Sequence, residues 1–320
     1  MCIALAAFDR AGYALIVCTN RDEFLDRPTL DAHWHAFEPL RNSADPVGAP
    51  SDGSESLSVP PSEASILSGR DAAAGGTWFG VSRNAKVALL TNITEPFQQF
   101  ATSRGALASE FLLAPRTPAM TVADEAAAIV AENERFAGFN LLLFDRPSSS
   151  RPSLTHPLVF EAMLVTNGGA GSQLSARALT PEERRAVGVS NGIDDHGGAQ
   201  WPKVCKGVEL FTAALEFAEA RTQSLGSSNE MLDDEESLVE RLFDLLLWHP
   251  DEDIHEHAHL RETIHVLSHL YGTRLSTVFL VRRDGRALFC ERDIWKLGAD
   301  GRPERGDPAA QRVCRFQMDI

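Results

Sequence analysis

Two apolar runs of strand length, separated by a four-residue turn, most strongly constrain how this chain begins to fold. The runs Cys2–Phe8 and Tyr13–Thr19 flank Asp9–Gly12. Asp and Gly are typical of tight hairpin turns, and apolar runs of this length bounded by turn residues are typical of strands. The sequence therefore predicts a hairpin that brings the chain back to its own N-terminus.

The returning strand of this hairpin carries polar residues toward the N-terminus. If the turn centres on Arg10 and Ala11, the residue numbers of each pair of opposite residues add up to about 21 or 22, with the usual slip of one residue. Cys2 then lies across from Thr19 or Asn20, and Asn20, Arg21 and Asp22 lie beside it where the second strand ends. A guanidinium group lowers the pKa of a nearby thiol, and a carboxylate orients an ammonium group or the guanidinium.

Cys2 directly follows Met1, so loss of Met1 alone would make it the first residue. It would then carry a thiol and a free α-amino group, whose ordinary pKa values are about 8.5 and 7.7–8.0. N-terminal nucleophile hydrolases use this pair, in which the amine replaces the histidine of a triad. From the residues alone, a second interpretation stays open. Cys2 is then a small buried apolar residue, and the polar run is a turn with a local ion pair.

Short motifs in a fixed order resemble the NRDE family, which is also called the transport and Golgi organisation protein 2 family. They run from residue 2 to about residue 292 and keep their order. The segments that carry the resemblance are Met1–Ile3, Asn20–Phe24, Arg27–Pro28, Gly69–Asp71, Gly75–Gly80, Val87–Asn92, Ser103–Gly105, Gly138–Leu141, Gly188–Asn191, Trp201–Val204, Tyr271–Arg274 and Glu291–Arg292.

The family is similar to the cysteine-type N-terminal nucleophile amidases and acyltransferases, which include choloylglycine hydrolase and penicillin V acylase. The resemblance implies an α+β fold, a four-layer αββα sandwich with two mainly antiparallel sheets. It places the N-terminus at the mouth of a cleft between the sheets. By the same resemblance, Cys2 is the nucleophile with Arg21 and Asp22 beside it. Asn92 and Asn191, each at the end of a strand-like run, are candidates to hold an oxyanion.

Four other residues are candidates for substrate binding. Trp78 and Phe79 would line an apolar cleft for an acyl chain, with core packing as the alternative for each. Asn20 is a candidate because the hairpin places it beside Cys2. Arg274 precedes a predicted strand, where it either faces an acidic group of a substrate or forms a structural ion pair.

Two functions are compatible with these features. The first is an amidase, thioesterase or acyltransferase that acts on a small-molecule amide or acyl thioester through Cys2. The alternative is a non-catalytic carrier of haem or lipid with a role in Golgi organisation and secretion. The family resemblance also links such chains to lipid metabolism in mitochondria and to haem movement. We expect no required cofactor, with haem only as a possible cargo.

Composition narrows the choice of partners and compartment. The formal net charge is −15, from 45 acidic and 30 basic residues, which disfavours nucleic acid or an anionic membrane surface as a partner. The five cysteines form no CxxC pair, so neither a disulfide framework nor a zinc site is indicated. No run approaches the ~18 apolar residues of a membrane span, and the N-terminus lacks signal-peptide features. We expect a cytoplasmic protein, with a mitochondrial or Golgi-associated pool on family grounds only.

The expected organisation is a single domain over residues 1–320 with a disordered insertion at 39–68, and further surface insertions at 146–152 and 224–236. We predict strands at residues 78–81, 86–91, 139–144, 158–165, 277–282 and 287–291. We predict helices at residues 105–113, 122–136, 181–187, 203–221, 238–247 and 260–270. A histidine-rich tract lies among acidic residues, and we interpret it as an exposed helix and not as a metal site. Its histidines are His249, His255, His257, His259, His265 and His269.

Overall fold

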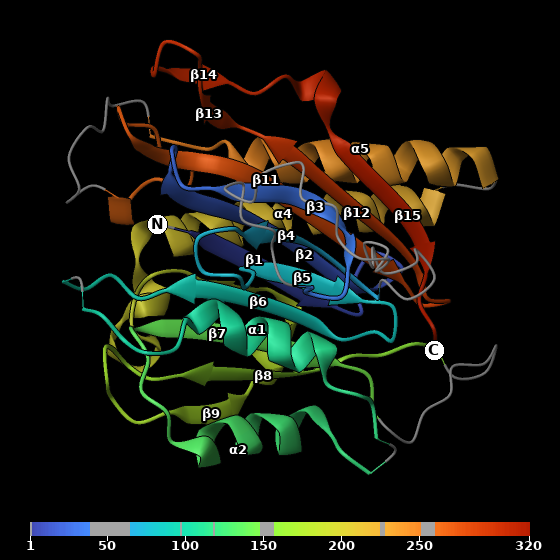
Figure 1. Cartoon of the computed structure of the whole chain (residues 1–320). Helices are drawn as coiled ribbons and strands as arrows, with labels where there is room; N and C mark the ends of the chain where they lie inside the picture. Colours follow the sequence, from blue (N-terminus) through green and yellow to red (C-terminus); the bar gives the residue numbers. More distant parts are fainter. Residues whose placement is uncertain are drawn as a thin grey trace, which may run out of the picture.

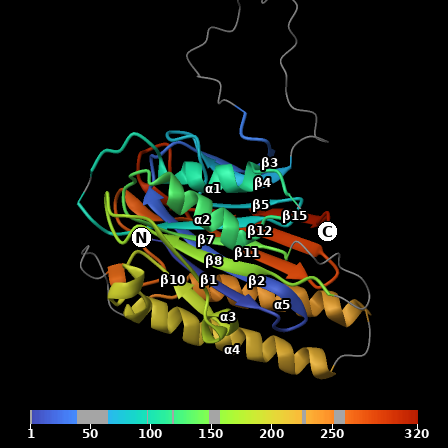
Figure 2. The ribbon, with the colours of Figure 1, turned by 90° about the horizontal axis from the view of Figure 1, so that it is seen from below.

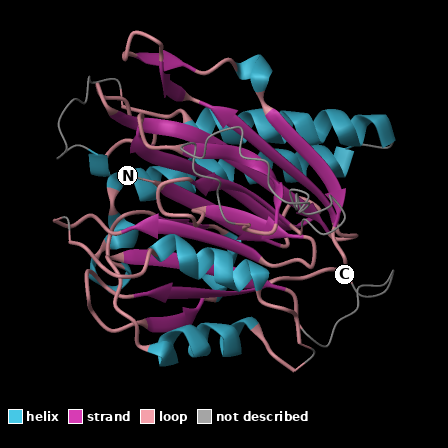
Figure 3. Cartoon of the chain, in the orientation of Figure 1, coloured by secondary structure: helices cyan, strands magenta, loops and turns pink. Residues whose placement is uncertain are grey.

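Two antiparallel sheets face each other, and helices cover the outer face of each (Figures 1 and 2). The computed structural model describes residues 2–38, 65–96, 98–117, 119–147, 157–224, 228–250 and 260–320. Figure 3 shows the strands gathered in the middle and the long helices outside them. This is the four-layer αββα sandwich that the family resemblance implies, so the predicted fold class is confirmed.

The first sheet contains the N-terminal hairpin at its centre and C-terminal strands on one side. Its six strands are ordered β10-β1-β2-β11-β12-β15. Their bounds are β1 Ile3–Phe8, β2 Tyr13–Phe24, β10 Val187–Val189, β11 Tyr271–Arg282, β12 Arg286–Asp293 and β15 Arg312–Gln317. Helices α4 (Pro202–Ser224) and α5 (Ser228–Leu246) pack on its outer face, and α3 (Pro181–Arg185) leads into β10.

The second sheet is built from the middle of the chain, in sequence order. Its seven strands run β3-β4-β5-β6-β7-β8-β9. Their bounds are β3 Thr29–His35, β4 Ile66–Asp71, β5 Phe79–Ser82, β6 Val87–Asn92, β7 Phe139–Asp145, β8 Glu161–Thr166 and β9 Ser175–Ala178. Helices α1 (Arg104–Leu113) and α2 (Val122–Glu132) cover it. A separate small pair joins β13 (Trp295–Leu297) to β14 (Pro303–Arg305).

Strand alternation divides the first sheet between two apolar cores. In β1, Ala4, Ala6 and Phe8 belong to the core between the sheets, whereas Ile3 and Leu5 belong to the core under α4 and α5. Successive side chains of a strand point to opposite faces, so both faces of a fully buried strand must be apolar. This explains why the run that begins the chain is apolar throughout and does not alternate with polar residues.

The N-terminal hairpin has the predicted strands but a shifted register. Ile3 pairs with Asn20, so paired residue numbers add up to 23. The turn centres on Ala11 and Gly12, both at positive φ (48° and 81°), and Tyr13 N donates to Arg10 O at 2.8 Å. Such a turn suits the twist of a hairpin, and glycine adopts positive φ freely. The prediction had centred the turn one residue too early.

The predicted strands and the first five predicted helices are present, with shifted ends. Thr121 and Asp124 form a capping box at the start of α2. Residues 228–236 form the first part of α5, so this helix begins ten residues before its predicted start at residue 238. The predicted insertion at 39–68 lies outside the described residues up to 64, and Ile66–Asp71 forms β4. Residues 148–152 of the remaining insertion also lie outside the described part.

The helix predicted at residues 260–270 is wrong. Its backbone instead folds against the start of β11, where Thr273 N donates to Val266 O at 2.8 Å and Leu267 bridges to Gly272. Pairing with the strand that follows directly supplies the hydrogen bonds that the helix would have supplied, so a tight turn forms in place of the helix. His265 and His269 therefore do not share a helix face, and residues 251–259 with their three histidines lie outside the described part.

Two further findings bear on partners. Within the described ranges, no cluster of three His, Cys, Asp or Glu side chains is arranged to hold a metal ion. No helix of the described chain has the length and apolarity needed to cross a bilayer.

Candidate functional site

Cys2 lies at the open end of the N-terminal hairpin, one residue before β1. Its residue is only 8% exposed. The thiol donates to the backbone oxygen of Asp22 over a sulfur–oxygen distance of 3.8 Å. The backbone oxygen of Cys2 accepts hydrogen bonds from Ser190 Oγ at 2.7 Å and from Lys203 Nζ at 3.4 Å. Segments far apart in the sequence thus meet at this residue.

Arg21 and Asp22 lie on opposite faces of the first sheet because they are neighbours on one strand. The Arg21 guanidinium lies over the Trp78 ring at 3.9 Å, on the side of the second sheet, and donates to Thr29 Oγ1 at 2.9 Å. Asp22 turns the other way, and its Oδ1 accepts a hydrogen bond from Thr273 Oγ1 at 2.6 Å. The hairpin therefore delivers both residues beside Cys2 but gives them different surroundings.

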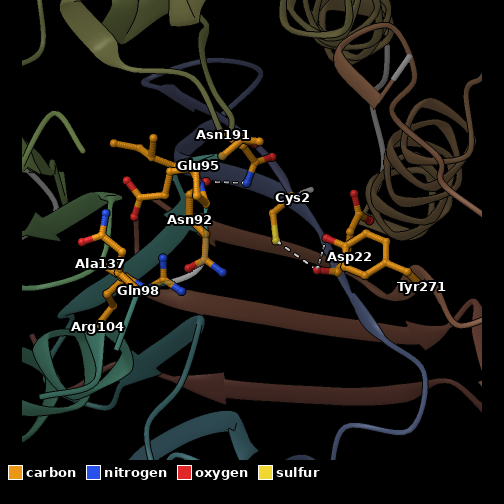
Figure 4. Close-up of a pocket in the computed structure, with 12 residues that line it drawn as sticks. Cys2, Asp22, Asn92, Glu95, Gln98, Arg104, Ala137, Asn191 and Tyr271 are labelled. Carbon is orange, nitrogen blue, oxygen red and sulfur yellow. Dashed lines mark hydrogen bonds between the residues drawn. The ribbon is translucent and has the colours of Figure 1, made fainter. Parts of the chain in front are cut away.

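Two cavities meet at Cys2, with volumes of about 380 and 270 Å³. Figure 4 shows the smaller one, with the Cys2 sulfur between Asn92 on one side and Asp22 with Tyr271 on the other. The larger cavity extends over Arg21 and Trp78. Five residues line both cavities: Cys2, Asp22, Asn92, Arg104 and Tyr271.

Asn92 and Asn191 join the two sheets at the edge of the smaller cavity. Asn191 Nδ2 donates to the backbone oxygen of Asn92 at 2.5 Å, and Thr94 N donates to the backbone oxygen of Asn191 at 2.9 Å. The Asn92 side chain points into the cavity in Figure 4. Asn92 is therefore placed to donate to a bound oxygen, whereas one N–H of Asn191 already holds the backbone.

Three predicted site residues lie outside the lining of both cavities. Asn20 is buried, and its side chain donates to Leu246 O at 2.8 Å and Ile264 O at 3.1 Å. Phe79 packs in the core between the sheets. Arg274 is the extra residue of a bulge in β11, and its guanidinium donates to the backbone oxygens of Phe24 and Arg27. These contacts support structural roles for all three.

Burial dominates the electrostatics of the thiol. It raises the pKa of Cys2 above its ordinary value, and the negative charge of Asp22 raises it further. Burial likewise lowers the pKa of Arg21, although Glu23 opposes this effect. Burial therefore outweighs the lowering of the thiol pKa that we expected from Arg21.

Several residues of the site were not predicted from the sequence. Lys203 is wholly buried, and burial lowers its pKa to about 8. The Tyr271 hydroxyl donates to the backbone oxygen of Asp22 at 3.1 Å, and burial raises the pKa of this hydroxyl. Arg104 lines both cavities and donates to Gly138 O at 2.8 Å. All three lie in segments that carry the family resemblance, and this was the one sequence signal that could have identified them. Their spacing along the chain does not show that they meet near Cys2.

The chain is similar over almost its full length to known proteins. The mouse Transport and Golgi organization 2 homolog is 28% identical over 313 residues, which cover 92% of this chain and 93% of that protein. The Drosophila melanogaster Transport and Golgi organization protein 2 is 25% identical over 323 residues, with 94% and 95% covered.

Two solved structures have a related arrangement at low identity. A variant of the Clostridium perfringens conjugated bile acid hydrolase has a TM-score of 0.44 at 8% identity, covering 99% of this chain and 92% of that one. The Caenorhabditis elegans N-acylethanolamine-hydrolyzing acid amidase ortholog has a TM-score of 0.42 at 11% identity, covering 87% and 92%.

The model of one protein family matches residues 1–43 and 54–296. The unmatched stretch between these ranges falls inside the insertion expected at 39–68. The match includes the hairpin with Cys2, both asparagines at the smaller cavity and the segments of Lys203 and Tyr271. The chain therefore belongs to the family described as Transport and Golgi organisation 2.

Proposed function

We propose that this protein, after loss of Met1, is a cysteine-type N-terminal nucleophile hydrolase or acyltransferase that acts on an amide or acyl thioester. One observation carries the proposal: Cys2 is one of the five residues that line both cavities, and its backbone oxygen accepts hydrogen bonds from two donors. A merely structural cysteine has no need of such a setting, as the wholly buried Cys18 in the neighbouring strand illustrates.

The reaction follows from the chemistry of a terminal cysteine. The α-amine of Cys2 takes the thiol proton while the sulfur forms a bond to the substrate carbonyl carbon. The Asn92 side chain donates to the oxyanion. Collapse of the intermediate breaks the bond to the leaving amine or thiol, which receives the proton from the α-ammonium group. Water, or an acceptor nucleophile, then releases the acyl group and returns the Cys2 thiol.

Asp22 and Arg21 have separate roles in this proposal. Asp22, held by Thr273 and lying next to the thiol, orients the α-amine of mature Cys2. Arg21 lies over the Trp78 ring and lines the larger cavity, so in this proposal it contacts the substrate beyond the reacting carbonyl. Trp78 supplies an apolar surface beside that charge, which suits a substrate with both polar and apolar parts.

Intact-mass analysis and peptide mapping test this proposal. We expect the purified chain to lack Met1 and to form a covalent adduct at Cys2 with an electrophilic acyl probe. The Cys2→Ala variant should form no such adduct. Cys205 is an exposed cysteine, so Cys205→Ala is the matched control and should keep the fast adduct. Retention of Met1, or labelling confined to Cys205, would contradict catalysis by Cys2.

One observation favours the alternative of a haem or lipid carrier. Phe24, which lines the larger cavity, is 54% exposed, and the neighbouring Leu270 is 59% exposed. Exposed apolar side chains beside a cavity suit an apolar cargo. Haem titration followed by absorbance would support this function if Trp78→Ala loses binding and Cys2→Ala retains it. Unaltered haem spectra would count against it.

The relatives are named for transport and Golgi organisation, so a Golgi-associated pool is part of this second proposal, as is a mitochondrial pool. Cell fractionation with detection of the tagged chain tests both. Recovery in neither organelle fraction would remove them from the proposal.

A further inference from the structure

Lys203 is an unusual component of the Cys2 surroundings. Its side chain is wholly buried (0% exposed) in the first turn of α4, and Nζ lies 3.4 Å from the backbone oxygen of Cys2. Ser190 Oγ donates to the same oxygen from the other side at 2.7 Å. Lysine is almost never fully buried unless its charge is compensated.

The neighbouring groups show which charges Lys203 acts on. Burial lowers its pKa to about 8, while the negative charges of Asp22 on β2 and of the Cys2 thiolate raise it. The ammonium form therefore still predominates at neutral pH. The other titratable or charged groups that act on the Cys2 thiol or on Asp22 are the N-terminal amino group, Glu23, Arg21, Arg104, His265 and Tyr271.

We infer that Lys203 is a positioning residue for mature Cys2: its ammonium group fixes the Cys2 carbonyl, and its charge favours the thiolate and an unprotonated α-amine. This inference rests on the proposed function. Lys203 touches no substrate and exchanges no proton, because the proton passes from Sγ of Cys2 to its own α-amine. A positive charge nearby disfavours a second positive charge on that amine and stabilises the negative sulfur. Both effects make Cys2 reactive at lower pH.

The pH profile of Cys2 alkylation by iodoacetamide, followed by peptide mapping, measures this effect. Lys203→Gln keeps a donor but removes the charge. We expect the midpoint to rise by about one pH unit and the rate at pH 7 to fall about tenfold. Lys206→Gln is the matched control, because Lys206 lies on the same helix in an ion pair with Glu209. It should leave both quantities unchanged.

A second variant and a thermal melt separate the charge from simple packing. Lys203→Arg keeps the charge and should keep the wild-type midpoint. A folded Lys203→Gln protein with the wild-type midpoint would overturn the inference. A thermal melt shows whether each variant is folded at the assay temperature. If Lys203→Gln is unfolded, Lys203→Met replaces it, because methionine fills a similar space without a charge. A folded Lys203→Met protein with the wild-type midpoint would equally overturn the inference.

The two hypotheses fail in different ways. If wild-type protein retains Met1 or its Cys2 does not react, the proposed function fails and the role of Lys203 fails with it. If wild-type Cys2 reacts but Lys203→Gln does not shift the midpoint of its alkylation, the inference about Lys203 fails and the proposed function stands.

Discussion

The chain buries two lysines completely, one in each half of the sandwich, and their surroundings differ. Lys86 lies just before β6 of the second sheet, where its ammonium group pairs with Glu125 and donates to Phe111 O and Ala114 O. These carbonyls belong to the end of α1, whose last carbonyls need donors. Lys203 lies under the first sheet and donates to the backbone oxygen of Cys2.

The charge of Lys86 therefore contributes to the stability of the fold, whereas burying the charge of Lys203 costs free energy. The carboxylate and helix carbonyls around Lys86 offset the free energy of removing its charge from water. Burial of Lys203 outweighs the attraction of Asp22, so its pKa falls to about 8. A buried charge that the fold does not fully compensate is more often found at a functional site than elsewhere.

The largest expected effect on stability comes from removing the buried charge of Lys86. Lys86→Met should lower the free energy of unfolding by about 3–5 kcal/mol, because it leaves the Glu125 carboxylate poorly paired and removes a donor from the end of α1. Chemical denaturation measures this change. Cys2 in the folded fraction should keep its alkylation midpoint, since Lys86 lies in the other half of the molecule.

Glu125→Gln provides the control for this prediction through a double-mutant cycle. The double variant should recover part of the stability lost in Lys86→Met, because no isolated charge is left behind. If Lys86→Met alone is as stable as wild type, the two lysines do not differ in the way described.

More of the fold could be predicted from the sequence than of these side-chain contacts. Apolar runs and turn residues located the N-terminal hairpin. The register differed because Ala11 accepts positive φ, which local preference does not favour. The segment 260–270 has helical periodicity, but pairing with β11 decides its structure. Helical periodicity misled the prediction where the strand that follows directly supplies the backbone hydrogen bonds through a tight turn.

The candidate site could be predicted only where the chain brings residues together locally. The hairpin placed Arg21 and Asp22 beside Cys2, and strand alternation would also have assigned them to opposite faces. Lys203 and Tyr271 reach Cys2 only through the packing of α4 and β11. No spacing rule connects residues that lie some two hundred positions or more along the chain from Cys2.

Acid tests His265, a second, partly buried titratable group in the same half of the molecule as Lys203. Burial lowers the pKa of His265 to about 4, and its Nε2 accepts a hydrogen bond from Trp295 Nε1 at 2.7 Å. Between pH 6.5 and 4 the unfolded chain binds more protons at this residue than the folded chain, so stability falls as pH falls through this window. We expect His265 to account for a loss of about 2 kcal/mol there.

His265→Gln tests this assignment, because glutamine can accept the same hydrogen bond without titrating. Denaturation at pH 7.5, 6 and 5 should show a flatter acid dependence in the variant. His35 also has its pKa lowered to about 4, so part of the acid dependence should persist. Parallel curves for wild type and variant would show that His265 is not such a group.

The smallest expected effect on stability is at Lys203, and it most sharply tests the contrast with Lys86. Lys203→Met at pH 7 should leave the free energy of unfolding within about 1 kcal/mol of wild type. It relieves the burial of a charge, worth about 3 kcal/mol from the lowered pKa, and it loses a hydrogen bond to Cys2 O of similar size.

The pH dependence of this difference makes the test independent of other groups. The folded-state pKa of Lys203 lies below its ordinary value of 10.5, at about 8. Between these values the unfolded chain binds more protons at Lys203, so wild-type stability rises with pH through the window. Lys203→Met lacks this contribution. From pH 7.5 to pH 9.5, denaturation should therefore show the free energy of unfolding of the wild type rising relative to that of the variant. A loss at Lys203→Met as large as that at Lys86→Met, independent of pH, would instead mean that both lysines stabilise the fold in the same way.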